Sequence, residues 1–196
     1  LLSLAILQRG DSIGMVLEQD GVLFFDDNSI WGAEPLAGSR SDLSPDLVDL
    51  FQIERDCFPL YNQVRGVPGY VGYNAWGLDA AADIVSAMGS ESRPFLLMVN
   101  VGAVDSAGHN LGPKGYVETI SGLDAPLGRL VEACKAEGVL LLITADHGMS
   151  FSTDRAKGGH SSAKYSSQTE SVMVPAVFIG PGVDDLVLAG NWSEVD

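Results

Sequence analysis

The chain has 196 residues, with 26 acidic side chains against 11 basic ones and a formal net charge of −15. A hydrophobic content of 46% is too high for a disordered chain, and the length suits one domain. The acidity argues against nucleic acid as a partner, because phosphate backbones need a basic surface. No apolar run reaches the roughly 18 residues that a membrane span requires.

The N-terminal residues predict one helix end followed by two short strands. Residues 1–8 have a helical pattern that stops at Gly10. Residues 13–17 and 22–25 are predicted strands, and turn-forming residues follow the second of them. The chain opens inside a helical pattern, so we expect it to be part of something longer.

The segment 30–77 is less regular, with several glycines and prolines. We expect an irregular insertion or loop-rich segment there, with one short helix over 45–51 that Ser44 would cap. The glycine-rich stretch 64–76 is predicted to be a loop, either packed against the domain or facing a substrate.

The rest of the chain alternates helical and strand patterns. Helices are predicted over 78–88 and 116–134, and buried strands over 95–101, 139–144 and 176–179. Nearly continuous apolar strands between amphipathic helices are typical of an α/β fold. We therefore expect a mostly parallel central sheet flanked by helices on both faces, in a single partial α/β domain that spans the whole chain.

The three histidines all lie after predicted strands or in a glycine-rich loop. Asp105 and His109 are one helical turn apart, which brings their side chains to the same side. Asp146 and His147 directly follow the strand over 139–144, and His160 lies in a polar, glycine-rich loop. In open α/β sheets, ligands bind outside the carboxyl ends of the strands.

Two interpretations of these residues remain open. Imidazole and carboxylate groups suit Zn²⁺ or Mn²⁺, so the five side chains are candidate metal ligands. Alternatively, each Asp–His pair is a local hydrogen bond or a helix cap. In that case the chain is a non-catalytic α/β binding or structural module.

Three motifs in this order resemble the alkaline phosphatase superfamily. They are Asp-Ser-Ala-Gly-His at 105–109, Thr-Ala-Asp-His-Gly-Met at 144–149 and Gly-Gly-His at 158–160. The resemblance covers roughly residues 78–196 and implies an incomplete alkaline phosphatase-like core. The layout is about equally similar to the phosphodiesterase-like and the cofactor-independent phosphoglycerate mutase-like branches of that superfamily.

The resemblance implies a site for two divalent metal ions, Zn²⁺ or Mn²⁺, with Mg²⁺ as a further option. Asp105, His109 and His160 would hold one ion, and Asp146 and His147 would help to hold the second. The implied reaction is hydrolysis or transfer of a phosphate, sulfate or phosphonate ester of a small molecule. In this superfamily the attacking group is a Ser or Thr.

No residue in the chain fits that nucleophile or the Asp-bearing first strand of the superfamily. We therefore expect a fragment whose nucleophile lies outside this chain and which is inactive alone. A homologue with a degenerate metal site is the alternative. Lys157 and Arg155 lie near His160 in sequence, and are either anion-binding residues for the substrate or solvated loop residues.

Overall fold

The structure is a computed structural model. It describes residues 65–89, 101–153 and 156–183, the strand backbones at 11–18, 21–27 and 36–38, and a few positions between 49 and 99. The predicted helix over 1–8 lies outside these residues, as does most of the helix predicted over 45–51.

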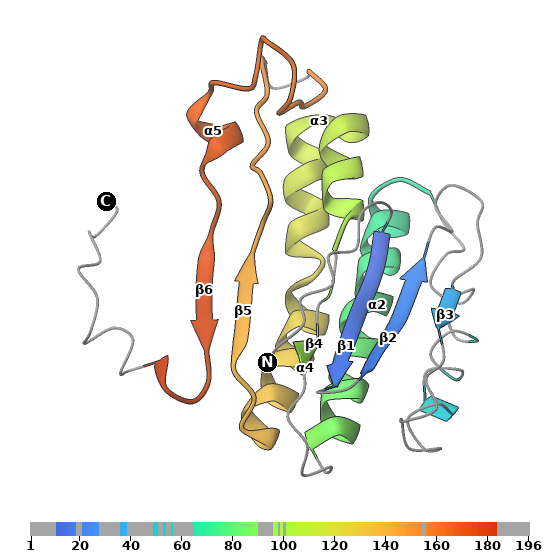
Figure 1. The fold of residues 1–196 in the computed structure, drawn as a ribbon. Helices are drawn as coiled ribbons and strands as arrows, with labels where there is room; N and C mark the ends of the chain where they lie inside the picture. The colour runs from blue at the N-terminus through green and yellow to red at the C-terminus, as the bar shows by residue number, and fades with distance from the viewer. Residues whose placement is uncertain are drawn as a thin grey trace.

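The described strands form one four-stranded and one two-stranded sheet (Figure 1). The four-stranded sheet has the order β3-β2-β1-β4, and β5 pairs with β6. The structure confirms the predicted strands over 13–17, 22–25, 139–144 and 176–179, and in the described part of the segment 95–101 it shows the two-residue strand β4. The strands are β1 (Asp11–Glu18), β2 (Gly21–Asp27), β3 (Leu36–Gly38), β4 (Leu96–Leu97), β5 (Leu141–Thr144) and β6 (Ala176–Ile179).

The predicted mostly parallel sheet is wrong for this part of the chain, because every pairing between the described strands is antiparallel. Two residues separate β1 from β2, and so short a connection allows only an antiparallel hairpin. β5 and β6 pair from Leu141 opposite Ile179 to Thr144 opposite Ala176. A parallel pair needs a crossover, usually a helix. The connection between β5 and β6 contains only a four-residue helix in its described part, and the chain reverses in the loop beyond β5 before it returns through α5 to β6 (Figure 1).

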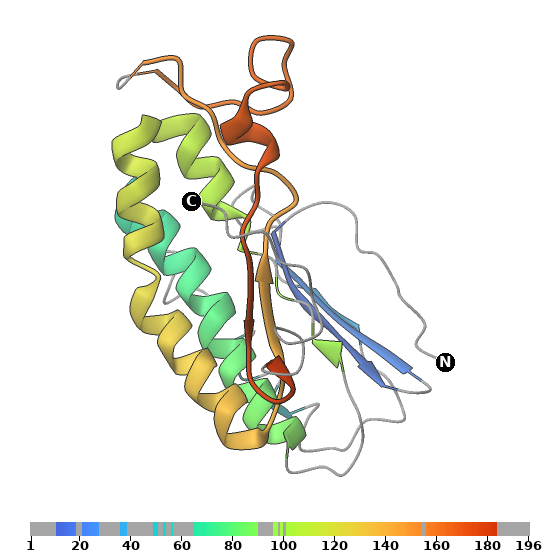
Figure 2. The ribbon, with the colours of Figure 1, turned by 90° about the vertical axis from the view of Figure 1, so that its left-hand side faces the viewer.

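Three long helices lie together on one side of the strands (Figure 2). The predicted cover of helices on both faces is therefore not seen in the described part of the chain. No described helix is long and apolar enough to cross a membrane. The helices are α2 (Val67–Gly89), α3 (Ala103–Ser121), α4 (Asp124–Glu137) and the short α5 (Thr169–Val172).

Helix α2 begins at Val67, so the loop predicted over 64–76 is wrong for most of its length. Pro68 lies in the first turn, where a missing N–H breaks no hydrogen bond within the helix. Each helical glycine costs about 1 kcal/mol relative to alanine. Tyr73 and Trp76 are only 4% and 1% exposed, and burial of these large rings outweighs that cost.

The helix predicted over 116–134 is two helices, α3 and α4, which are separated at Gly122 and Leu123. Helix α3 begins earlier than predicted, at Ala103, and is kinked at Gly112, where φ is 72°. Gly112 precedes Pro113, and a residue before proline is disfavoured in helical geometry. The early start of α3 places Asp105 in its first turn.

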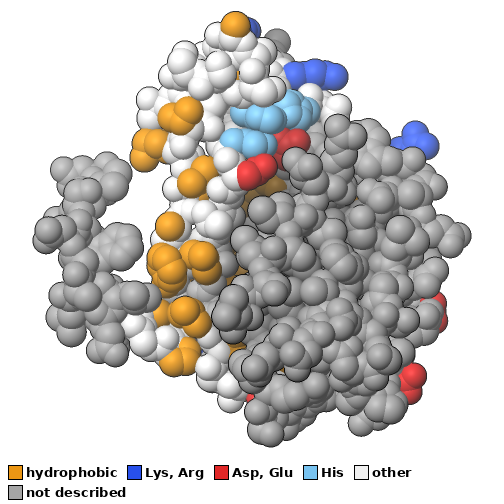
Figure 3. Space-filling model, viewed as in Figure 1, with side chains coloured by type: hydrophobic (Ala, Val, Ile, Leu, Met, Phe, Trp, Pro, Cys, Tyr) orange, Lys and Arg blue, Asp and Glu red, His pale blue; other side chains and the backbone are white. Residues whose placement is uncertain are grey.

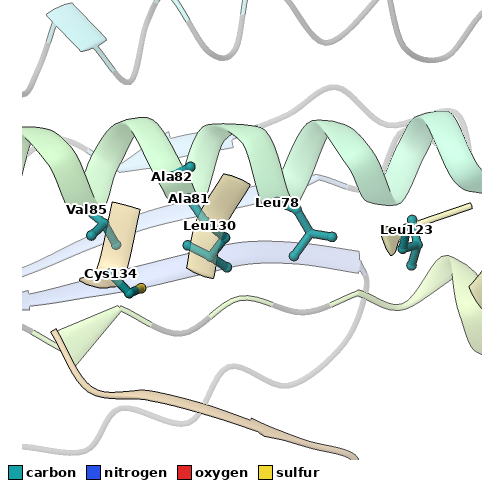
Figure 4. Packing of buried hydrophobic residues seen from close by; sticks show 7 residues of the cluster. All are labelled: Leu78, Ala81, Ala82, Val85, Leu123, Leu130 and Cys134. Carbon is teal, nitrogen blue, oxygen red and sulfur yellow. The ribbon is translucent and has the colours of Figure 1, made fainter. Parts of the chain in front are cut away.

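The core lies between α2 and α4 (Figure 4). Full burial of a leucine stabilises the fold by about 1.5–3 kcal/mol, so this cluster fixes the two helices against each other. Beside it, Arg129 donates to Asp79 Oδ1 through Nε at 2.8 Å and through Nη2 at 2.6 Å. The buried members of the cluster are Leu78, Ala81, Ala82, Val85, Leu123, Leu130 and Cys134.

Candidate metal centre

The start of α3 is fixed by a side chain of α2. The Asn74 side-chain carbonyl Oδ1 accepts a hydrogen bond from the Ala103 N–H at 3.1 Å, and Asn74 is buried. The first N–H groups of a helix lack partners within the helix, so this bond satisfies one of them. Asp105 and His109 lie on successive turns that follow this fixed point.

Gly158 and Gly159 connect the segment after β5 to α3 through backbone hydrogen bonds. Ser150 and Gly159 exchange two backbone hydrogen bonds of 3.0 Å each. The Gly158 N–H donates to the Gly108 carbonyl, also at 3.0 Å. The glycine-rich loop is therefore held against both the segment after β5 and α3, which brings His160 beside His109.

Three side-chain atoms meet where these segments join. His109 Nε2 lies 3.2 Å from His160 Nε2 and 3.3 Å from Asp105 Oδ1. His160 Nε2 lies 3.5 Å from the same carboxylate oxygen. The three residues form a group whose donor atoms all lie within 4.8 Å of one another. Figure 3 shows histidine side chains gathered beside acidic side chains on one face of the molecule.

The ring orientation of His109 is set by the glycine-rich loop. His109 Nδ1 lies 2.9 Å from the Gly158 carbonyl oxygen, which can only accept a hydrogen bond. The proton of the neutral imidazole therefore lies on Nδ1, which leaves the lone pair on Nε2. Nε2 is the ring atom that lies beside His160 Nε2 and Asp105 Oδ1. This is the orientation that a histidine needs to ligate a metal through Nε2.

The geometry of the three atoms fits a divalent cation. Asp105 Oδ1 is buried and has no hydrogen-bond partner, an arrangement that is unfavourable unless a cation is nearby. Around a tetrahedral Zn²⁺ with bonds of about 2.0–2.1 Å, neighbouring ligand atoms lie about 3.3–3.4 Å apart. The three measured separations bracket that value. One carboxylate oxygen and two imidazole nitrogens are also a donor set that Zn²⁺ accepts.

Asp146 and His147 lie next to this group but do not join it. The His147 ring stacks on the His160 ring, with centroids 3.5 Å apart and planes 10° apart. His147 Nε2 lies 3.6 Å from Asp146 Oδ2, and the Asp146 side chain is 90% exposed. The structure therefore places His147 against His160, with the Asp146 carboxylate in solvent beside it.

The surroundings of His160 favour its neutral form. Burial lowers the pKa of His160, and the neighbouring imidazole of His147 lowers this pKa further. A neutral imidazole is the form that binds metal. The carboxylates of Asp105 and, less strongly, Asp146 raise this pKa and so act in the opposite direction.

The two basic residues predicted near His160 have different outcomes. Lys157 is exposed, one residue before the Gly158–Gly159 pair. Arg155 lies outside the described residues. An anion-binding role for either side chain stays a prediction.

The sequence motifs did not indicate what holds the loop against α3. Met149 fills the space between two glycines and is 7% exposed. A Cβ atom at Gly108 would lie 2.8 Å from Met149 Cε, and one at Gly158 would lie 2.5 Å from Met149 Sδ. A side chain at either position would therefore displace the end of Met149, so the two glycines let Met149 pack between α3 and the loop. The only available signal was that each of the three motifs contains glycine and that Met149 is the last residue of the second motif.

Comparison with known proteins gives one family and several curated relatives. Residues 63–194, more than half of the chain, match the model of the metalloenzyme superfamily. A 2,3-bisphosphoglycerate-independent phosphoglycerate mutase of Thiobacillus denitrificans is 32% identical over 112 residues, which cover 57% of this chain and 21% of that protein. The corresponding mutase of Gloeobacter violaceus is 41% identical over 59 residues, covering 30% of this chain and 11% of the relative.

A third relative is alkaline phosphatase PhoD of Zymomonas mobilis, which is 33% identical over 91 residues, 43% of this chain and 16% of that protein. The chain therefore spans only about a tenth to a fifth of the length of these relatives. No solved structure matches the chain significantly. The family match covers all three histidine motifs, and the chain belongs to the metalloenzyme superfamily, as its resemblance to alkaline phosphatases indicated.

Proposed function

We propose that the protein is a metal-dependent enzyme that hydrolyses or transfers the phosphate group of a small-molecule ester. One observation carries the proposal: Asp105 Oδ1, His109 Nε2 and His160 Nε2 lie 3.2–3.5 Å from one another. The mutase and phosphatase relatives support phosphate esters over sulfate or phosphonate esters.

In this proposal, Asp105, His109 and His160 hold the first cation, and Asp146 and His147 contribute to the second. Two bound divalent cations would supply positive charge to the transferring group and would acidify the attacking hydroxyl. Zn²⁺ and Mn²⁺ suit the mixture of imidazole and carboxylate donors.

Residues of this chain orient the histidine ligands and leave one side of the metal centre accessible to solvent. The Gly158 carbonyl sets the ring orientation of His109, and burial lowers the pKa of His160, which favours the neutral imidazole. The exposed Asp146 carboxylate leaves its side of the centre open to solvent, where a substrate can approach. The Ser or Thr nucleophile is proposed to lie outside this chain, and Lys157 and Arg155 are candidates to attract the substrate anion.

A non-catalytic binding or structural module remains the alternative function. It requires the histidines to be satisfied by local hydrogen bonds alone. The buried, unpartnered Asp105 Oδ1 favours the metal centre instead, because no hydrogen bond compensates for its burial.

The test is calorimetric titration of the chain with Zn²⁺ and with Mn²⁺. The wild type is expected to bind, and Asp105→Ala and His160→Ala are each expected to weaken binding at least ten-fold. Asp83→Ala is the control, since it removes an exposed carboxylate of α2. Absence of binding by the wild type, or equal binding by all four proteins, would refute the metal centre.

A further inference from the structure

A buried pair of serines joins the segments that carry the candidate ligands. Ser150 follows the Asp146–His147 motif and Ser171 lies on α5, and they are only 1% and 3% exposed. Their hydroxyl oxygens are 2.7 Å apart. Two buried hydroxyls so close together form a strong hydrogen bond, which ties α5 to the segment after β5.

The direction of this hydrogen-bond chain follows from the number of protons. Ser171 Oγ also lies 3.4 Å from the Gly159 carbonyl oxygen, which can only accept. The 2.7 Å bond can run in either direction, but a hydroxyl has one proton to donate, so the arrangement that forms both bonds has Ser150 donate to Ser171 and Ser171 donate to Gly159. These two hydrogen bonds therefore lead from the Ser150 hydroxyl through the Ser171 hydroxyl to the carbonyl of Gly159, the residue directly before His160.

The backbone of Ser171 holds the other candidate motif. Its carbonyl accepts a hydrogen bond of 2.9 Å from the N–H of Gly148, the residue directly after His147. One residue of α5 thus contacts both motifs. Its side chain reaches the His160 loop, and its main chain reaches the His147 segment.

We propose that Ser171 is a positioning residue that holds His160 in place for the first cation. This inference rests on the proposed metal centre. Partners that orient metal ligands typically change metal affinity by about ten-fold to a hundred-fold when they are removed. Substitution of the side chain removes the bond to Gly159 and leaves the backbone bond to Gly148 intact.

The pair supplies its own matched control. Ser150→Ala and Ser171→Ala both break the hydroxyl–hydroxyl bond, but only Ser171→Ala also removes the bond to Gly159. The 196-residue chain and both variants are titrated with Co²⁺, whose visible spectrum reports on coordination geometry. We expect Ser171→Ala to weaken Co²⁺ binding about ten-fold relative to Ser150→Ala and to change the spectrum.

Two further variants keep the test decisive. Ser171→Thr retains the hydroxyl and is expected to bind Co²⁺ with nearly wild-type affinity. If Ser171→Ala does not fold, the double variant Ser150→Ala/Ser171→Ala replaces it, because removing both partners leaves no buried hydroxyl without a bond. The double variant is then compared with Ser150→Ala.

Equal Co²⁺ affinity in Ser150→Ala and Ser171→Ala (or the double variant) would overturn the positioning role. This result would leave the metal centre itself intact if the wild type still binds. Failure of the wild type to bind Co²⁺ would instead refute the proposed function and with it this inference.

Discussion

The rings of His147 and His160 are stacked, with centroids 3.5 Å apart and planes inclined by 10°. The two residues come from different motifs, and His160 also faces His109, whose ring is inclined to it by 51°. One face of the His160 ring therefore packs flat against His147. Its Nε2 atom lies beside His109 and Asp105, the other two candidate ligands of the first cation. The stack couples the two proposed cation sites physically.

The first prediction concerns the stacking of His147 on His160. His147→Ala is expected to weaken Zn²⁺ binding by Asp105, His109 and His160 by about two-fold to ten-fold, because an aromatic contact contributes about 0.5–1.5 kcal/mol. His147→Phe keeps a flat ring and is expected to retain most of the affinity. Competition with a chelator measures both values, and equal loss in the two variants would contradict a role for the stack.

The second prediction concerns the unpartnered Asp105 carboxylate. Asp105→Asn removes the negative charge of a half-exposed carboxylate whose Oδ1 is buried without a hydrogen-bond partner, so the metal-free protein should be as stable as the wild type or more stable. Zn²⁺ should raise the melting temperature of the wild type, since a ligand that binds only the folded state stabilises it. The variant should show little of that rise. Thermal unfolding with EDTA and with Zn²⁺ measures both effects, and Asp83→Asn serves as the control.

The third prediction tests the close approach of α5 to the motif after β5. A Cβ atom at Gly148 would collide with the carbonyl oxygen of Glu170 and would lie 2.9 Å from that of Met173. Both obstacles are backbone atoms, so Gly148→Ala should destabilise the fold by about 1–3 kcal/mol. Urea unfolding measures the change.

Gly128→Ala is the matched control for this substitution. Gly128 lies inside α4, and nothing lies within 4 Å of a Cβ atom built there. The same change should therefore stabilise the protein by about 0.4–1 kcal/mol. If both substitutions shifted stability in the same direction, the close approach of α5 would not be the cause.

The fourth prediction concerns activity. Asp146 and His147 offer two donors for a second cation, and the described residues bring no third one to them. The 196-residue chain should therefore bind one divalent cation and show no turnover of p-nitrophenyl phosphate. Turnover that disappears in His160→Ala would contradict this prediction, and turnover unaffected by that substitution would indicate a contaminating phosphatase.

The candidate site was more predictable from sequence than the sheet. The four-residue spacing of Asp105 and His109 needs only the local geometry of one helix to bring the side chains together. The contact of His160 with them depends on tertiary hydrogen bonds through Gly108 and Ser150, which no spacing reveals. The resemblance to a known family, rather than periodicity, assigned His160 to this group.

The errors in the fold have two physical origins. Helical and strand patterns describe segments, whereas the direction of a strand depends on its connections, so β5 and β6 were wrongly expected in a parallel sheet. The start of α2 was missed because its glycines and Pro68 suggest a loop. Burial of Tyr73 and Trp76, which is a property of the tertiary structure, overrides that local preference.

His109 and His160 are separated by 51 positions, yet their Nε2 atoms are 3.2 Å apart. A cation bound by both would bridge the two ends of that whole loop, but only in the folded chain. Because the ligands come together only on folding, the cation binds the folded state in preference to the unfolded one, which couples metal binding to folding. The cation would bind tightly only after α3, the segment following β5 and the glycine-rich loop have come together. Its uptake would thus report the completion of folding, rather than the formation of any one helix.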